Sequence, residues 1–90
     1  MAVPICRVGD SGSHGGAYIG SITTGVTNTF DNGVEIAVVG CIYSCPTHGS
    51  QTIIIGSTEV FIGSNGVARI GDTISCGAIL DTGDSNFQIV

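Results

Sequence analysis

Residues 40–49 read Gly-Cys-Ile-Tyr-Ser-Cys-Pro-Thr-His-Gly, and this segment decides the fold because two of its positions recur with a period of 31 residues. Shifting the chain by this period aligns Gly40 with Gly9 and Gly71, and a metal-ligand type of residue stands five positions after each glycine. These residues are His14, Cys45 and Cys76. A fixed period is the signature of a repeat architecture. A soft ligand in every repeat suggests that the repeats meet around one metal ion.

The composition of the 90 residues predicts a single all-β domain. The 15 glycines and the many Ile, Val and Thr residues are typical of strands joined by tight turns. No stretch of ten or more residues carries an apolar stripe at helical spacing. We therefore expect an all-β, pseudo-threefold arrangement of three repeats of about 31 residues, whose ligand-bearing turns converge at an apex. Residues 1–90 contain no linker and are expected to form one domain with no appended enzyme.

Local signals predict where the chain turns and extends. The Asn-Gly pairs at 32–33 and 65–66 predict tight turns, because both central positions of a type I′ turn need positive φ. The β-branched run 52–56 and the segment 86–90 are expected as strands. The Gly-Asp pairs at 9–10 and 71–72 are interpreted as turns in which the Asp side chain accepts hydrogen bonds from backbone N–H groups.

The charge distribution excludes some classes of partner. A net charge of −5, with two arginines and no lysine, argues against binding to nucleic acid or to an anionic membrane surface. Residues 1–7 lack a basic region followed by a long apolar run, so we expect no signal peptide and synthesis in the cytoplasm. An apolar fraction of 42% with 10% charged residues suggests that a partner covers part of the surface.

A fourth ligand type, His48, follows Cys45 at Cys-x₂-His spacing. Together, His14, Cys45, His48 and Cys76 form a Cys₂His₂ set that suits one tetrahedral, structural Zn²⁺. Iron is the alternative metal, although two thiolates and two imidazoles favour zinc. In a different interpretation the two histidines cap turns, and the cysteines pack as small apolar residues.

Two cysteines, Cys6 and Cys41, lie outside the ligand register. We expect both to be buried free thiols, with a Cys6–Cys41 disulfide as the alternative. Two disulfides in the chain would need an oxidising compartment, which the missing signal peptide disfavours. The sequence has no Ser-His-Asp arrangement, phosphate-binding loop or dinucleotide fingerprint, so we expect no enzyme. A zinc enzyme would need an open coordination position and a general base.

The sequence resembles the PAAR-repeat proteins along essentially its whole length. Segments 4–16, 44–62 and 68–77 resemble successive copies of the repeat, with its Arg, Gly-Asp and His- or Cys-bearing turn. The middle copy departs from the pattern, because Val38 stands in place of the arginine and Cys41 in place of the aspartate. The proline that normally precedes Ala68-Arg69 is also missing.

The resemblance implies a β-rich cone with zinc near its tip, whose base docks on a trimeric β-helical spike protein, one copy per trimer. Family members hold the ion with three histidines and one cysteine, and the matching positions here are His14, Cys45, His48 and Cys76. The implied function is to cap and sharpen the spike of a type VI secretion apparatus or a phage tail, which contacts the target outer membrane mechanically. The protein would then be secreted on firing or be part of a virion, with effectors as further non-covalent partners. The alternative function is a free-standing zinc-stabilised adaptor that binds another partner.

Overall fold

The computed structural model describes residues 2–15 and 17–90, and short antiparallel strands and turns form all the regular structure of these residues. The predicted all-β class is confirmed, because none of these residues is helical. The described residues accordingly contain no helix that could cross a membrane. The strands are β1 (Val3–Ile5), β2 (Ser11–His14), β3 (Ala17–Ile22), β4 (Phe30–Asp31), β5 (Val34–Glu35), β6 (Ile42–Cys45), β7 (Gly49–Thr52), β8 (Phe61–Ile62), β9 (Asn65–Gly66), β10 (Ile79–Leu80) and β11 (Asp84–Ile89).

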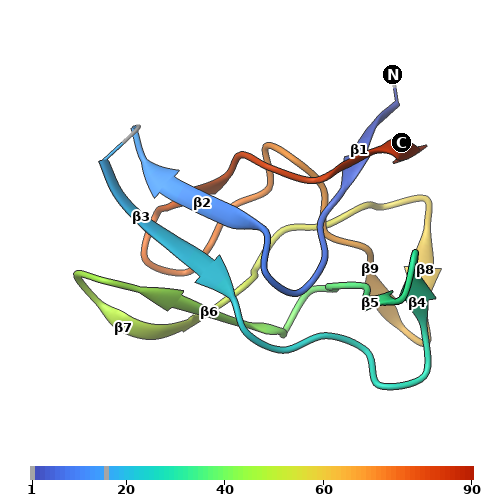
Figure 1. Cartoon of the computed structure of the whole chain (residues 1–90), viewed down its shortest axis with the longest axis horizontal. Coiled ribbons are helices and arrows are strands. Elements are labelled where there is room, and N and C mark those ends of the chain that lie inside the picture. The colour runs from blue at the N-terminus through green and yellow to red at the C-terminus, as the bar shows by residue number, and fades with distance from the viewer. Residues whose placement is uncertain (1, 16) are drawn as a thin grey trace.

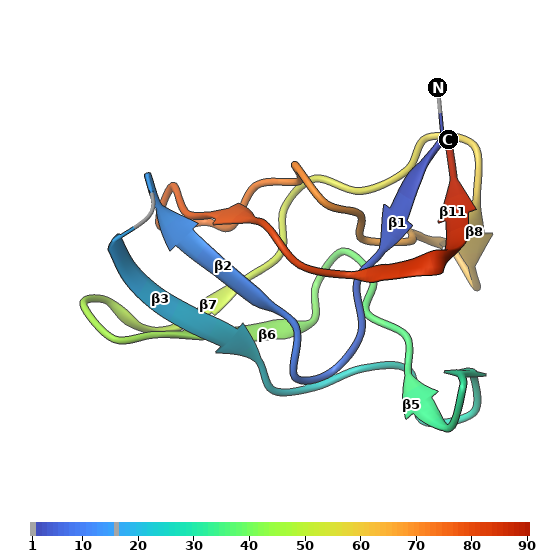
Figure 2. The ribbon, with the colours of Figure 1, turned by 45° about the horizontal axis from the view of Figure 1, so that its top comes forward.

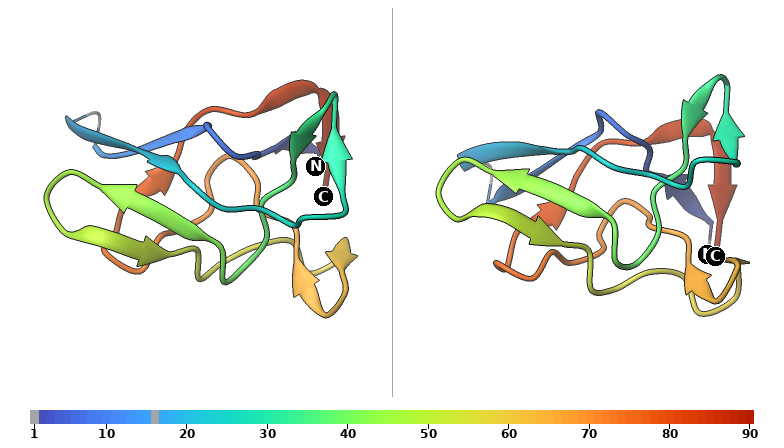
Figure 3. Two further views of the ribbon diagram at one scale, coloured as in Figure 1. Left: turned by 60° about the horizontal axis from the view of Figure 1, so that its bottom comes forward. Right: turned by 90° about the horizontal axis from the view of Figure 1, so that it is seen from below.

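The strands separate into one sheet and three small ribbons. The sheet has five strands in the order β10-β2-β3-β6-β7, and the ribbons are β4–β5, β8–β9 and β1–β11. Figure 1 shows the labelled strands of the sheet toward the left and the ribbons toward the right. The same separation of the two ends is visible from the other directions in Figure 2 and Figure 3. The molecule therefore has a sheet end and a ribbon end, whose functions can differ.

A closed ring of three backbone hydrogen bonds joins the repeats at the centre of the molecule. The Cys6 amide donates to the Ala68 carbonyl at 2.9 Å, Ala68 to Ala37 at 2.9 Å, and Ala37 to Cys6 at 3.1 Å. These residues are 31 positions apart, and all three side chains are fully buried. Three segments can approach one axis this closely only if the side chains between them are small. The ring thus gives the predicted pseudo-threefold arrangement a direct physical basis.

The recurring glycine forms the same turn in each repeat. The φ angles of Gly9, Gly40 and Gly71 are 95°, 96° and 95°, in a region that L side chains rarely adopt. In each case the glycine amide donates to a carbonyl on the returning segment, at distances of 2.8–2.9 Å. The three glycines at 31-residue spacing therefore adopt the same backbone conformation in each repeat.

The residue after each glycine closes this turn, as predicted for the two Gly-Asp pairs. The Oδ2 atom of Asp10 accepts from the Arg7 amide at 2.8 Å, and that of Asp72 accepts from the Arg69 amide at 2.7 Å. In the middle repeat the Sγ atom of Cys41 takes this place, 3.5 Å from the Val38 amide. The arginine and the aspartate are thus replaced together by an uncharged pair that preserves the turn.

The two Asn-Gly signals have different outcomes. Asn32 and Gly33 have φ angles of 54° and 82° and join β4 to β5, as predicted for a type I′ turn. The turn predicted at 65–66 is wrong, because these residues form β9 and the chain turns two residues earlier, at 63–64. Gly66 is instead needed for close packing, since a Cβ atom there would lie 2.2 Å from the Ser57 carbonyl oxygen.

The strand predicted at 52–56 is also largely absent. Strand β7 ends at Thr52, and beyond it Ile53 forms only an isolated bridge with Ile74. The chain crosses there from the sheet to the next ribbon and cannot pair continuously with either. The strand predicted at 86–90 is confirmed as β11, which pairs with β1. The third ribbon is thus formed by the two ends of the described chain.

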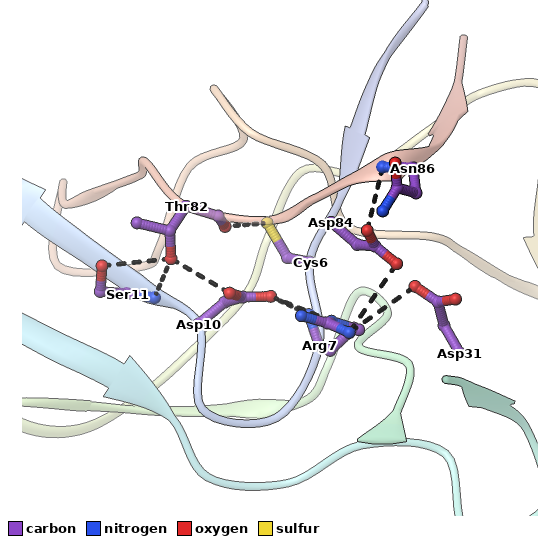
Figure 4. Close-up of polar contacts among 8 residues, drawn as sticks. All are labelled: Cys6, Arg7, Asp10, Ser11, Asp31, Thr82, Asp84 and Asn86. Carbon is purple, nitrogen blue, oxygen red and sulfur yellow. Dashed lines mark hydrogen bonds and ion pairs between the residues drawn. The ribbon is translucent and has the colours of Figure 1, made fainter. Parts of the chain in front are cut away.

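Three carboxylates surround Arg7 near this third ribbon, as Figure 4 shows. The nitrogen–oxygen distances from Arg7 to Asp10, Asp31 and Asp84 are 3.7, 3.9 and 3.8 Å. In the described part of the chain, Nε of Arg7 and Oδ2 of Asp31 are buried without a hydrogen-bond partner. Interaction with the Asp84 side chain raises the pKa of Asp31, and the same interaction lowers the pKa of Asp84. One arginine therefore leaves this cluster with an excess of negative charge.

The ribbon end carries an apolar hollow of about 210 Å³. Its lining includes Ile5, Ile36 and Val67, which directly precede the three residues of the central ring. Phe30 from β4 and Phe87 from β11 also contribute to its wall. The pseudo-threefold axis therefore reaches the surface at an apolar depression.

Candidate metal centre

The four predicted ligands lie at the sheet end, at or beside the ends of strands. His14 is the last residue of β2, and Cys45 is the last residue of β6. His48 occupies the turn between β6 and β7, and Cys76 occupies the turn that precedes β10. Because β2 and β6 both flank β3 in the sheet, their ends approach one another. Segments far apart in the sequence are in this way brought to one corner of the molecule.

Glycines shape the two tight turns that carry the candidate ligands of the second and third repeats. Cys45 pairs with Gly49, so the hairpin closes around His48 with Gly49 at a φ of 78°. Gly77 follows Cys76 at a φ of 94°. Neither glycine would have a neighbour within 4 Å of an added Cβ atom. These glycines are therefore required by backbone conformation and not by crowding.

The donor atoms of the four residues face one another. The Sγ atom of Cys45 lies 3.4 Å from Nε2 of His14 and 3.4 Å from Nδ1 of His48. The Sγ atom of Cys76 lies 3.6 Å from the same Nε2 of His14. All four donor atoms lie within 4.8 Å of one another. The two imidazole rings are tilted by 59°, with centroids 5.1 Å apart, so that they do not stack.

These separations match those of a tetrahedral metal site. Zinc–sulfur bonds of about 2.3 Å and zinc–nitrogen bonds of about 2.0–2.1 Å, at tetrahedral angles, put neighbouring sulfur and nitrogen donors about 3.5 Å apart. The three sulfur–nitrogen distances of 3.4–3.6 Å agree with this value. The group could therefore hold one metal ion with little rearrangement.

The Cys45 thiol is prepared to act as a ligand. Burial on its own would raise its pKa, but hydrogen bonds from the His48 ring, the Thr47 backbone and the His14 ring outweigh burial and lower that pKa to about 6. A thiol must be deprotonated to bind a metal, so a thiolate at neutral pH favours binding. Cys45 is buried, His14 and Cys76 are half-buried and His48 is exposed, which places the group just below the surface.

The other two cysteines are separate from this group. Both are free and buried, as expected. The Cys6 thiol donates to the Thr82 carbonyl at 3.2 Å, and burial strongly raises its pKa, which keeps it protonated. Cys41 is engaged in the middle turn through the Val38 amide. Neither thiol has the environment of a ligand or a nucleophile.

A supporting residue that the sequence did not indicate is Asp81. Its carboxylate accepts hydrogen bonds from the hydroxyls of Ser11 at 2.9 Å and Ser13 at 3.0 Å. It thereby ties β2, which ends at His14, to the segment that follows Cys76 and β10. No sequence signal could have found it, because the positions 31 and 62 residues before Asp81 hold no acidic residue.

Comparison with known proteins identifies the family. A search of curated protein sequences gives no match. A family model described as the PAAR motif matches residues 8–81, which span most of the chain and include all four residues of the candidate metal centre. The repeat register, the all-β fold and this match agree, and the chain belongs to the PAAR-repeat family.

Proposed function

We propose that this protein is a metal-stabilised tip that caps a trimeric β-helical spike in a contractile injection machine. Membership of the PAAR-repeat family supports a spike-tip role in such machines generally. The observation that carries the proposal further is the division of the molecule into two ends. A candidate metal centre lies at the sheet end, and an apolar hollow on the pseudo-threefold axis lies at the ribbon end.

We propose that His14, Cys45, His48 and Cys76 hold one Zn²⁺. Two thiolates neutralise the charge of the dication, which suits a half-buried site, and the mixed sulfur and nitrogen set favours zinc over iron. Four protein donors leave no coordination position for water, so the role of the ion is structural and the protein is not expected to be an enzyme. Native-purified protein should contain about one zinc per chain by elemental analysis. A folded protein that carries no metal as purified under native conditions would refute this part of the proposal.

The ion would cross-link all three repeats at the end that meets the target. His14 comes from the first repeat, Cys45 and His48 from the second, and Cys76 from the third. Short turns held by few contacts are the parts of a fold that open first. A shared ion removes this freedom, and for small peptides structural zinc contributes about 10–16 kcal/mol of apparent binding free energy. This stiffening is the physical basis of the proposed piercing role.

The ribbon end is the proposed docking base. Each of the three ribbons contributes to the wall of the hollow, through Phe30 on β4, Ile62 on β8 and Phe87 on β11. The side chains of Phe30 and Phe87 are 55% and 44% exposed. Exposed aromatic side chains around an apolar hollow are typical of surfaces that a permanent partner covers. A threefold-symmetric partner can place equivalent groups against three similar ribbons. One copy of this chain would then occupy the end of one trimer.

Native mass spectrometry of the chain mixed with the trimeric spike protein from the same host tests the docking proposal. We expect one copy per trimer. Phe30→Ser should weaken the complex, because Phe30 lines the apolar hollow and is 55% exposed. Ile19→Ser, which changes a 65% exposed side chain on β3 at the sheet end, should not. No binding, or three copies per trimer, would overturn the tip assignment in favour of an adaptor for another partner. Equal effects of the two substitutions would reject the ribbon end as the base.

A further inference from the structure

Two of the four candidate ligands are thiols that come from different repeats. The Sγ atoms of Cys45 and Cys76 lie within 4.8 Å of each other, and both lie against Nε2 of His14, at 3.4 and 3.6 Å. A disulfide needs a sulfur–sulfur bond of about 2.05 Å. The two sulfur atoms must therefore move closer together to react, and Cys76 lies in a turn, a part of the fold that opens more readily than paired strands. The pair is thus placed for a reaction as well as for ligation.

The environments of the four cysteines single out this pair. Cys76 is half-buried, so a small oxidant can reach it, while Cys45 is only 2% exposed. Cys6 is fully buried and donates its thiol hydrogen to a backbone carbonyl. Cys41 is buried in the middle turn. A partly exposed sulfur with a second thiol within reach has the arrangement of a redox-sensitive cysteine pair.

We propose that Cys45 and Cys76 form an oxidation site, at which a peroxide converts the two ligands into a disulfide between the second and third repeats. The proposal rests on the metal centre proposed above, and it concerns only the residues of that centre. It predicts a covalent state of the tip in which the metal is lost but one cross-link between repeats remains.

The reaction proceeds in two balanced steps. The Cys76 thiolate attacks one oxygen of hydrogen peroxide, the O–O bond breaks, and a sulfenic acid and one hydroxide form. The Cys45 thiolate then attacks the sulfenic sulfur of Cys76, the S–S bond forms, the S–O bond breaks and a second hydroxide leaves. The two sulfurs together lose two electrons, which reduce the peroxide to two hydroxides. The two histidines alone hold a metal ion much less tightly, so the ion leaves.

Oxidation should change the cross-linking of the tip without unfolding it. The disulfide would preserve the connection between the second and third repeats. His14 would lose its shared contact, while β2 would stay in the sheet through its pairing with β3 and β10. The first repeat should therefore loosen selectively at the tip. The two arginines of the chain make the product easy to identify, because trypsin cleaves only after Arg7 and Arg69.

The test uses the zinc-loaded chain treated with hydrogen peroxide. Released zinc is followed with a coloured chelator, and intact mass and non-reducing tryptic digestion are measured after blocking free thiols. We expect one zinc released and two hydrogen atoms lost per chain, with peptides 8–69 and 70–90 joined by a disulfide and peptide 1–7 free. Reduction with dithiothreitol should separate the peptides and restore zinc binding.

Matched variants assign the disulfide to the pair. Cys41→Ser and Cys6→Ser should still give joined peptides, because neither thiol takes part, whereas Cys76→Ser should give none. Digestion of the wild-type chain together with Cys41→Ser is decisive even if Cys76→Ser fails to fold, because Cys41 and Cys45 lie in the same tryptic peptide. Joined peptides that disappear in Cys41→Ser, attachment of peptide 1–7, or sulfinic acids without a disulfide would each overturn the proposal. A chain purified without zinc refutes the metal centre, and a zinc-loaded chain that forms no disulfide refutes this inference alone.

Discussion

Substituting serine for Cys76 and for Cys6 gives opposite predictions under two explanations of the fold. Cys6 is fully buried at the central ring, whereas Cys76 is half-buried in a surface turn. If packing alone stabilises the protein, Cys6→Ser should be the more damaging change. If Cys76 is a metal ligand, Cys76→Ser should be the more damaging change whenever metal is bound. The order of the two effects therefore reports on the metal centre.

The magnitudes follow from the site. An even share of the roughly 10–16 kcal/mol of structural zinc binding among four ligands gives about 3 kcal/mol for Cys76. At about 4–8 °C per kcal/mol for a domain of this size, Cys76→Ser should lower the melting temperature by about 12–24 °C. Cys6→Ser should cost only about 1 kcal/mol, because the serine hydroxyl can still donate to the Thr82 carbonyl. Without metal, Cys76→Ser should change the free energy of unfolding by no more than about 0.5 kcal/mol.

The assay is thermal unfolding of the wild-type chain and both variants, with zinc and with excess chelator. With zinc, Cys76→Ser should melt well below Cys6→Ser. With chelator, Cys76→Ser should melt close to the wild type, while the deficit of Cys6→Ser should persist. A deficit of Cys76→Ser that chelator leaves unchanged would refute Cys76 as a ligand, and so would equal effects of the two variants with zinc bound.

Two further predictions concern charge and backbone conformation. The raised pKa of Asp31 means that this carboxyl holds its proton more tightly in the folded chain than in the unfolded chain, so the contribution of Asp31 to stability should fall as the pH rises through that pKa. Asp31→Asn should therefore stabilise the protein at neutral pH and lose this advantage in acid, as measured by denaturant unfolding at both pH values. Glu59→Gln, at an exposed position, is the control and should change stability little at either pH. An effect of Asp31→Asn that does not depend on pH would contradict this explanation. Gly40→Ala should cost about 1–2 kcal/mol through the φ of 96° alone, since an added Cβ there meets nothing within 4 Å. Gly20→Ala should cost more, because its Cβ would lie 2.1 Å from the Ser44 carbonyl oxygen, and equal melting temperatures of the two variants would refute this distinction.

The sequence by itself determined the features that depend on local conformation and on the period. Turn glycines with positive φ, the closing aspartates and the absence of helical spacing predicted an all-β fold of repeated turns. The 31-residue register also predicted which ligand types would meet, because equivalent positions in a threefold arrangement lie around one axis. His48 needed only its short spacing from Cys45. None of these inferences required knowledge of which strands pair.

Only the tertiary structure decided the features built from unrelated positions. The pairing of β1 with β11 and the support from Asp81 join segments that carry no matching local signal. The Asn-Gly pair at 65–66 shows the same limit, because close packing against Ser57 placed Gly66 inside a strand and moved the turn to 63–64. Turn chemistry acts over a few residues, whereas crowding at an axis depends on chain segments that only folding brings together.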